Sequence, residues 1–307
     1  MIGYFLNAAL YLCLTVFPYN EREISWFENT QVVLLVILVE IILFEGKTVE
    51  DRATLMIFGQ ACDPNFLVGF IMFPFSVAVK RVIERKYRLI YLVLVCLSIY
   101  CVFLTGSRGG LIAIAVMIAS FALIYPTKVY VKLIFLIAGV TFILVAWLIA
   151  VPWLPKSIIE RMSIKSVIET GGTGRWSIWM SMLNTIVNSP EELLFGHGFY
   201  GANKIFFNGT WHKTIAHSQI IQVLFEQGIV GLISFLALTI GCILRCIKKR
   251  KTVSIAIIGM MALSISLSFN QTTRTFWNLV AYAAMIFPES QDHRSVENLE
   301  LPEDAEP

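Results

Sequence analysis

Long apolar runs alternate with short polar breaks along most of the chain. Many runs approach the length of about 20 residues that an α-helix needs to cross the hydrocarbon core of a membrane. The pattern therefore predicts an all-α fold, a polytopic transmembrane helix bundle over residues 1–288 with about nine spans. The candidate spans are 1–18, 26–44, 65–80, 89–105, 109–125, 133–151, 218–244, 253–269 and 275–288.

Composition agrees with a membrane protein. The chain is 57% hydrophobic and 15% charged, with a mean hydropathy of +0.74. A soluble domain cannot bury so much apolar surface. The six cysteines include no CxxC pair and lie mostly in or beside apolar runs, so we expect neither a disulfide framework nor a metal site. Residues 1–17 lack a basic start and a small-residue cleavage site, so no cleavable signal peptide is expected.

Basic residues predict the orientation of the bundle. Half of the 24 Lys and Arg residues fall in 80–88, 127–132 and 245–251. The positive-inside rule assigns these loops to the cytoplasmic side, and two predicted spans separate each from the next, as a common side requires. The acidic tail, 289–307, is poor in apolar residues and is predicted to be disordered and cytoplasmic. The outer side then receives 45–65, 105–110, 152–217 and 270–274.

The large external loop, 152–217, is where chemistry is expected. Its first part, 154–168, has apolar residues at near-helical spacing, which favours a helix along the membrane surface or an ordinary amphipathic connector. Gly171, Gly172 and Gly174 then precede a helix expected to begin near Arg175. A glycine-rich turn before a helix presents free N–H groups to anions, although such turns are also common without a ligand. The expected apolar face of that helix is Trp176, Trp179, Met180, Leu183 and Val187.

Three arginines are candidates to bind an anion from the outer side. Arg175 offers a planar fork suited to phosphate. Arg108, in "TGSRGG", either anchors its helix at the interface or points inward at an anionic ligand, with glycines on its flank that permit close approach. Arg274 has the same two interpretations, and the interfacial anchor is the simpler one.

Polar residues gather at the start of the span 218–244. Ser218, Gln222 and Glu226 are spaced four apart, so they share one helix face, with Gln219 adjacent to it. A glutamate within a span is costly in lipid, so this stripe should face the bundle interior or a water-filled cavity. His217 precedes the stripe at the outer surface, although a lone histidine is more often structural than catalytic. Gly228 and Gly231 lie on another face, where a second helix could approach closely.

Four segments, in order, resemble the O-antigen ligase and polymerase superfamily, integral-membrane enzymes of bacterial surface-polysaccharide assembly. They are "DPNFLVGF" (63–70), "TGSRGGLIAIAV" (105–116), "GRWSIWMSML" (174–183) and "HSQIIQVLFEQGIVG" (217–231). The resemblance covers about residues 50–285 and implies a C-type membrane glycosyltransferase that uses no metal ion, cofactor or nucleotide sugar. The implied donor is an oligosaccharide linked to a polyprenyl diphosphate.

The resemblance also assigns roles. It makes Arg108, Arg175 and His217 catalytic: the guanidinium groups stabilise the departing diphosphate, and the imidazole accepts the proton of the attacking hydroxyl. Direct displacement would invert the anomeric centre. The expected substrate-binding residues are Arg274, Glu226, Gln222 and Gly174. The expected partners are the lipid-linked oligosaccharide, an acceptor glycan, the lipid bilayer and chain-length regulator or flippase proteins, without nucleic acid.

The chain also departs from the family pattern. Family members usually have more helices before the "DPN" segment, and ligases commonly continue after the second glycine with a small hydroxyl residue and Trp. Here Leu232 and Ile233 follow Gly231, which favours a polymerase over a ligase. A polymerase in the bacterial cytoplasmic membrane, with its active site on the external face, is thus the main hypothesis. The alternatives are a ligase, a transporter or flippase of anionic lipid-linked glycans, and a non-catalytic scaffold.

Overall fold

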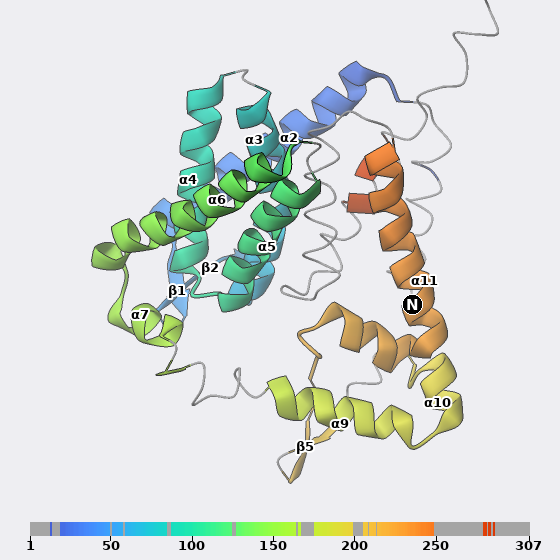
Figure 1. Ribbon diagram of the computed structural model, residues 1–307. Coiled ribbons are helices and arrows are strands. Elements are labelled where there is room, and N and C mark those ends of the chain that lie inside the picture. Colours follow the sequence, from blue (N-terminus) through green and yellow to red (C-terminus); the bar gives the residue numbers. More distant parts are fainter. Residues whose placement is uncertain are drawn as a thin grey trace, which may run out of the picture.

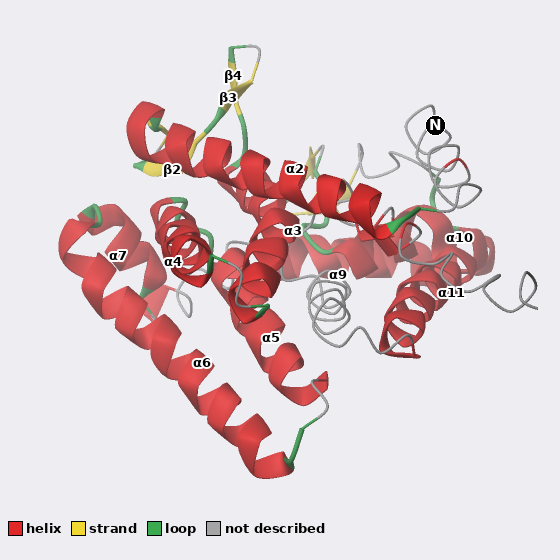
Figure 2. Ribbon diagram, turned by 90° about the horizontal axis from the view of Figure 1, so that it is seen from above, coloured by secondary structure: helices red, strands yellow, loops and turns green. Residues whose placement is uncertain are grey.

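Helices dominate the part of the chain that the structure, a computed structural model, describes (Figures 1 and 2). The predicted span 253–269, the loop 270–274 with Arg274, the tail 289–307, nearly all of 1–18 and Gly171, Gly172 and Gly174 lie outside the described residues. The described residues are 13, 19–49, 51–57, 59–84, 87–124, 127–163, 165–166, 175–198, 205–207, 209–212, 214–248, 279–280, 282–283 and 285.

The larger core is built from consecutive helices in the first half of the chain. Helix α3 is the most enclosed of them, since it packs against α2, α4 and α5, and Leu67, Ile71 and Phe75 on it are fully buried. Helix α6 lies at the edge, where Ala150 is its single buried residue. The helices are α2 (Glu21–Glu40), extended by the π-helical turn η1 (Ile41–Glu45), α3 (Pro64–Ile83), α4 (Arg88–Leu104), α5 (Arg108–Ile124) and α6 (Val129–Ala150).

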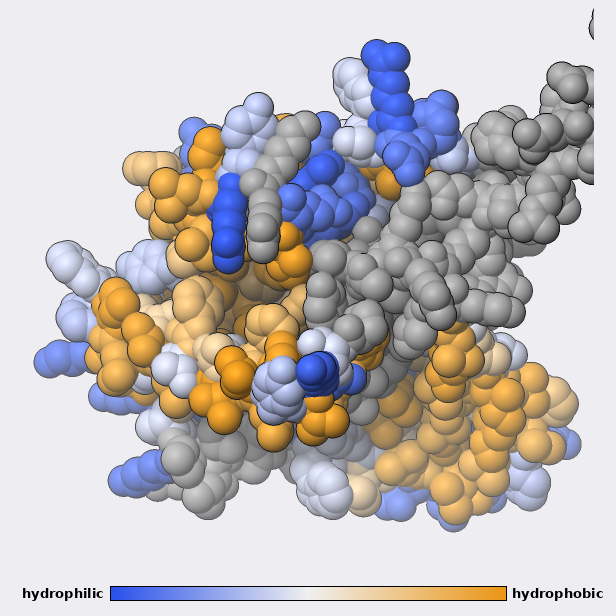
Figure 3. All heavy atoms as spheres, turned by 45° about the horizontal axis from the view of Figure 1, so that its top comes forward, coloured by the Kyte–Doolittle hydropathy of each residue, from blue (hydrophilic) through white to orange (hydrophobic). Residues whose placement is uncertain are grey.

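The outer surface of this bundle requires a membrane. Leu148 on α6 is 69% exposed, and Leu133 and Ile137 are more than half exposed. Figure 3 shows broad apolar areas on the surface, far more than a soluble monomer presents to water. Within the part of the chain that the structure describes, four helices are long and apolar enough to cross a membrane, and α4 and α5 are shorter apolar helices of 17 residues. The four are Glu21–Phe44, Pro64–Ile83, Val129–Trp153 and Gln219–Gly241.

Six of the nine predicted spans therefore coincide with helices in the described residues. The predicted span 275–288 is described at 279–280, 282–283 and 285, which are helical. The membrane class of the protein is confirmed. The number of nine spans is not confirmed by these helices.

Sequence-local caps fix where two helices begin. At α2, the Asn20 side chain accepts the Glu23 N–H (3.0 Å) and the Glu23 carboxylate accepts the Asn20 N–H (2.8 Å), a reciprocal capping box. At α3, the Asp63 carboxylate accepts the Asn65 N–H (2.7 Å), and Pro64 occupies the first helical position, where no N–H is required.

A buried carboxylate joins three helical segments at one end of the bundle. Glu28 on α2 is 1% exposed and pairs with Lys80 and with Arg81 (3.0 Å), both on α3. The Tyr282 hydroxyl also donates to Glu28 (2.5 Å). A charge enclosed in this way persists only when it is paired, so these contacts fix α2 against α3 and against the described part of 275–288.

The opposite end of the bundle brings together segments that are far apart in sequence. Arg52 Nε donates to the Thr105 carbonyl oxygen (2.8 Å), and Arg161 Nε donates to the Gly106 carbonyl oxygen (3.3 Å). The Ser107 hydroxyl donates to the Asn65 side-chain oxygen (2.8 Å). Parts of 45–65, 105–110 and 152–217, which the charge pattern assigned to one side, therefore meet in space.

Three short antiparallel hairpins interrupt the helical fold, so the prediction of an all-α fold is correct only for the bulk of the chain. Asp51, Gly59 and Gly209 have positive φ angles at the turns, and such turns close two-residue hairpin loops. The hairpins are β1 (Lys47–Val49) with β2 (Arg52–Thr54), β3 (Met56–Ile57) with β4 (Gln60–Ala61), and β5 (Ile205–Phe207) with β6 (Thr210–His212).

The described part of the external loop includes short helices and one of these hairpins. A 3₁₀ turn, η2 (Val151–Trp153), leads into the short helix α7 (Lys156–Met162), within the predicted surface segment. Helix α9 (Arg175–Val187) covers the predicted helix from Arg175 onward. Helix α10 (Pro190–Phe195) follows and packs on both α9 and α11 (Gln219–Lys248).

The buried face of α9 differs from the predicted one. Ile178, Met182 and Ile186 are buried, whereas Trp176 and Val187 are each 62% exposed. The spacing of four residues still places the buried side chains on one helix face, rotated from the expected face because β5 and α11 cover that side. Periodicity alone did not tell which of two apolar faces would be covered.

Helix α11 is broken at Gly228, which was expected to be a packing glycine in a continuous span. Its backbone (φ 66°, ψ −166°) lies in a region that only glycine adopts readily. Figure 1 shows the two parts of α11 running in clearly different directions. The polar residues Ser218 to Glu226 therefore lie before the break, and the apolar part of α11 lies after it. Glu226 is thus not part of a straight helix that faces lipid, and the free-energy cost of a glutamate in such a helix does not arise.

Two glycines bring α10 against this break. A Cβ on Gly228 would lie 2.3 Å from the Leu194 carbonyl oxygen, and a Cβ on Gly196 would lie 2.3 Å from the Gln227 nitrogen. The break leaves two carbonyl groups of α11 without their usual helical partners. The N–H groups of His197 and Gly198 donate to them instead, at Phe225 (2.7 Å) and Glu226 (3.1 Å).

Candidate functional site

Arg108 is the first residue of α5, and its side chain reaches into the external loop. Its Nε donates to the Arg161 carbonyl oxygen (2.8 Å), and one terminal nitrogen donates to the Ser166 hydroxyl (2.8 Å). These contacts direct the guanidinium toward α7 and not outward along the membrane interface. The structure thus favours the inward orientation among the two interpretations of this arginine.

Side chains of the "DPN" segment (63–65) form hydrogen bonds with the turn that precedes Arg108. Asp63 accepts a second hydrogen bond from the Asn65 side-chain nitrogen (2.8 Å), which orients that amide. The Asn65 oxygen then accepts from the Ser107 hydroxyl, and that hydroxyl accepts the Gly110 N–H (3.1 Å) at the start of α5. A chain of three side chains therefore links the N-terminus of α3 to the N-terminus of α5.

Gly106 completes this turn between α4 and α5. Its φ is +59°, a conformation in which other residues are strained. Its carbonyl oxygen accepts a hydrogen bond from Arg161. A Cβ added to Gly106 would lie 3.5 Å from the Arg52 side chain and 3.6 Å from the Arg161 side chain. The turn is thus closely surrounded by arginine side chains.

His217 is held by the backbone immediately before it. The Ala216 carbonyl oxygen accepts from the Trp179 indole (2.6 Å), and the Ala216 N–H donates to the Gln222 amide oxygen (2.8 Å). The Gln222 nitrogen in turn donates to Glu226 (2.7 Å). Both peptide groups of Ala216 are thus fixed by side chains, one from α9 and one from α11.

The backbone of His217 is itself strained. Its φ is +50°, the left-handed region that few residues other than glycine enter, although His, Asn and Asp are enriched there. Ser218 follows as the cap of α11, since its hydroxyl accepts the Ile221 N–H (3.3 Å). Outliers of this kind persist where surrounding contacts enforce them, and they cluster at functional sites.

Charge interactions connect these separately positioned groups. Burial lowers the pKa of His217 below its ordinary value of 6.5, and the positive charge of Arg175 lowers it further, whereas Asp63 acts in the opposite direction. Burial also lowers the pKa of Arg175, with Asp63 raising it and Arg161 lowering it. The imidazole is therefore biased toward its neutral form, which can accept a proton.

Arg108 belongs to the same group of charges. Burial lowers its pKa first, and the positive charges of Arg161 and Arg175 lower it further. All three guanidiniums remain charged at any physiological pH. We name Asp63, Arg108, Arg161, Arg175 and His217 the arginine cluster, and with a neutral imidazole its net charge is +2, three guanidiniums against one carboxylate.

Helix N-termini add to this positive field. Asp63 caps α3, Arg108 and Arg175 are the first residues of α5 and α9, and His217 directly precedes the cap of α11. Each helix start carries partial positive charge and backbone N–H groups without intrahelical partners. The arrangement is suited to bind an anion with several negatively charged oxygens.

Charge interactions link the three residues expected to be catalytic, since the positive charge of Arg175 acts on both Arg108 and His217. Among the expected substrate-binding residues, Gln222 and Glu226 are buried. Gln222 accepts the Ala216 N–H and donates to Glu226, so both residues support the backbone before His217. Gly174 and Arg274 lie outside the described residues. Substrate contact by any of these residues stays a prediction.

Two members of the cluster were not expected to belong to the site. Asp63 stands in a quoted motif, but its charge was not connected with His217. Arg161 lies in α7, where alternating charged and apolar residues indicate only an amphipathic helix. The external placement of α7 was the one sequence signal that could have pointed to Arg161.

Comparison with known proteins agrees with the motif pattern. The family model described as O-antigen ligase matches residues 92–236, a range that includes Arg108, Arg175 and His217. A protein of Haemophilus influenzae, described as uncharacterized, is 26% identical over 255 residues, which are 72% of this chain and 62% of that protein. This chain thus spans less than two thirds of that relative's length. No solved structure matches the chain. The match over residues 92–236 supports the resemblance to the O-antigen ligase and polymerase superfamily that the motifs indicated.

Proposed function

We propose that the protein is a glycosyltransferase that uses an oligosaccharide linked to a polyprenyl diphosphate as its donor. The observation that carries the proposal is the arginine cluster, in which three guanidiniums and a neutral-biased histidine meet at one end of a membrane helix bundle. A diphosphate diester carries one negative charge on each phosphate, which matches the net charge of the cluster. Its polyprenyl chain requires a site beside lipid.

The residues suggest a direct displacement. The acceptor hydroxyl attacks the anomeric carbon of the donor sugar and gives its proton to the neutral imidazole of His217. The bond between the anomeric carbon and the diphosphate oxygen breaks, and the electron pair leaves with the diphosphate. Arg108 and Arg175 stabilise the charge that develops on the leaving group, and the anomeric centre is inverted.

Arg161 and Asp63 influence this reaction through their charges. Arg161 adds a third positive charge near the leaving group. Its carbonyl oxygen also accepts a hydrogen bond from Arg108 and so orients that side chain. Asp63 counteracts the effect of the arginines on His217, because a carboxylate favours the protonated imidazole. The base thereby retains enough proton affinity to act.

Among the possible acceptors, we favour a second lipid-linked repeat unit, so that the protein acts as a polymerase at the external face of the bacterial cytoplasmic membrane. The support is the segment after Gly231, where Leu232 and Ile233 replace the small hydroxyl residue and Trp common in ligases. Transfer to a different acceptor, as a ligase performs, is the alternative.

The test is a reconstituted reaction with purified protein and a synthetic polyprenyl-diphosphate repeat unit. A ladder of lengthened lipid-linked products supports the polymerase, and transfer only to an added acceptor such as a lipid A core supports the ligase. Arg175→Ala should abolish either product. Wild-type product from Arg175→Ala, with the protein present in equal amount, would remove the cluster from the mechanism.

A further inference from the structure

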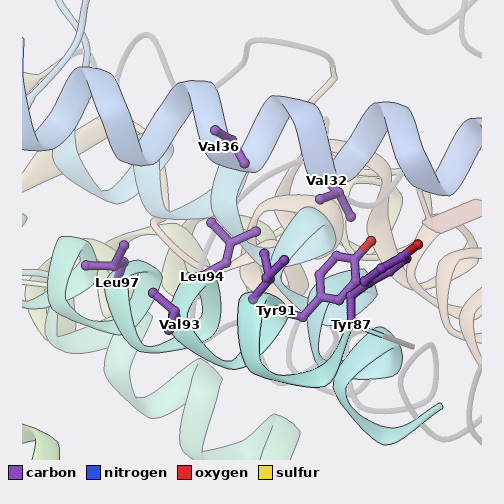
Figure 4. Close-up of a pocket in the computed structure, with 8 residues that line it drawn as sticks. Val32, Val36, Tyr87, Tyr91, Val93, Leu94 and Leu97 are labelled. Atoms are coloured by element: carbon purple, nitrogen blue, oxygen red, sulfur yellow. The ribbon is translucent and has the colours of Figure 1, made fainter. Parts of the chain in front are cut away.

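A groove runs between α2 and α4 and opens at the end of the bundle opposite the arginine cluster (Figure 4). It consists of two adjoining cavities of about 500 and 360 Å³. Val32, Tyr87 and Tyr91 line both cavities, so they form one continuous channel. Helix α4 has 17 residues, so the arginine cluster lies about 25 Å away along the bundle.

The inner part of the groove is apolar. Figure 4 shows Val36 of α2 facing Leu94 and Leu97 of α4 across it. Val36 and Leu97 are 47% and 38% exposed, so the groove is open to the surroundings of the bundle and not sealed within it. From Tyr87 to Leu97 the helix rises about 15 Å, roughly half the thickness of the hydrocarbon core. An acyl chain of one leaflet has the length and chemistry to fill this space.

The outer part of the groove is polar. Arg81 lines it together with Ser25 and Asn29, and one terminal nitrogen of Arg81 contacts the Asn29 oxygen (3.2 Å). Arg81 Nε is buried and donates to no acceptor among the described residues. A buried donor without an acceptor is costly, and an anionic oxygen in this cavity would satisfy it.

Tyr87 marks the entrance between the two parts. It holds a left-handed backbone (φ 53°), which is rare for a bulky residue, and its ring is 65% exposed. Tyrosine rings with one apolar and one polar end are typical of the membrane–water interface. The hydroxyl groups of Tyr87 and Tyr91 lie side by side near the mouth of the groove (Figure 4).

The charge of the residues around the groove favours a lipid with an anionic headgroup. The segment 80–88 contains five Lys and Arg residues and one Glu, and even with the buried Glu28 the local charge is clearly positive. Basic segments beside a membrane attract anionic lipids electrostatically. We propose that this groove is a binding site for one anionic phospholipid, with an acyl chain between Val36 and Leu97 and the phosphate at Arg81, Tyr87 and Tyr91.

Purified full-length protein is tested in nanodiscs of phosphatidylcholine, with phosphatidylglycerol added as the probe. Native mass spectrometry counts the lipids that stay bound after the disc is removed. We expect one phosphatidylglycerol to be retained in preference to phosphatidylcholine. Val36→Trp fills the apolar part and should weaken retention about tenfold or more, since the acyl chain loses its burial. Leu148→Trp, on an exposed position of α6, is the matched control and should retain the lipid.

Leu97→Trp repeats the test from the opposite wall if Val36→Trp does not accumulate. Both variants should keep glycosyl transfer, because their side chains line the groove between α2 and α4 and are not part of the arginine cluster, so this proposal and the proposed function fail independently. Equal retention of the two phospholipids overturns the site, as does unchanged retention by both groove variants. Displacement of phosphatidylglycerol by an equal amount of a polyprenyl phosphate overturns the assignment of the occupant.

Discussion

Gly228→Ala tests the break in α11, on which the placement of His217, Gln222 and Glu226 depends. The added Cβ would lie 2.3 Å from the Leu194 carbonyl oxygen, 2.4 Å from its carbon and 2.6 Å from the Phe195 nitrogen. All three are backbone atoms, so no side-chain rotation can relieve the contact. Helix α10 must move away, or α11 must straighten.

The magnitude follows from two terms. A residue other than glycine in this backbone region costs of the order of 1–3 kcal/mol. Forcing an additional methyl group into a packed contact typically costs a further 1–3 kcal/mol. We therefore expect a loss of stability of about 2–6 kcal/mol, together with weaker hydrogen bonds from His197 and Gly198 to the carbonyl groups of Phe225 and Glu226.

Gly241→Ala is the matched control on the same helix, because nothing lies within 4 Å of its added Cβ. The measurement is the thermal unfolding midpoint of both variants and the wild type in detergent, with transfer activity assayed in parallel. Gly228→Ala should unfold at a clearly lower temperature and lose activity, whereas Gly241→Ala should match the wild type. Equal midpoints for the two variants would refute the described contact between α10 and α11.

Four further predictions concern the arginine cluster and the contact of Gln222 beside it. Arg175→Ala should lower the transfer rate by about 10²–10³, and Arg175→Lys should recover only part of it, because an ammonium lacks the planar fork; initial rates with saturating donor measure both. The wild-type rate should fall as the pH drops through the pKa of His217, with a midpoint below 6.5, because protonation removes the base. Asp63→Asn preserves the cap of α3 but removes the charge that raises this pKa, so the midpoint of the pH–rate profile should move lower still; a shift to higher pH would contradict the assignment. Gln222→Ala should lower the turnover number more than it changes KM, because it frees the Ala216 N–H beside the base; an unchanged rate would show that this contact does not position His217.

The sequence predicted the membrane class, six of the helices and the starts of α5 and α9. These features rest on local signals, namely apolar runs and the breaks between them. Arg108, Arg175 and His217 were expected to be catalytic because their motifs and the distribution of basic loops assigned them to one side. Their catalytic role rests on the family resemblance and stays a prediction.

The features that were missed depend on distant parts of the chain. Nothing near Asp63 or Arg161 in the sequence indicates that their charges act on Arg175, since α3, α7 and α9 are far apart along the chain. The break at Gly228 lies inside a helical pattern that continues on both sides of it, and at Gly228 the chain packs closely against α10. The strands have two or three residues each, too short for an alternating pattern to be recognised.

The most direct test of the central claim is the transfer rate of His217→Asn in the reconstituted reaction. Asparagine tolerates the left-handed backbone of position 217 but cannot accept the proton, so the fold should be preserved while the base is removed. We predict a fall of about 10²–10⁴ in rate with an unchanged unfolding midpoint. Transfer by His217→Asn at the wild-type rate would contradict the role of His217 as the base.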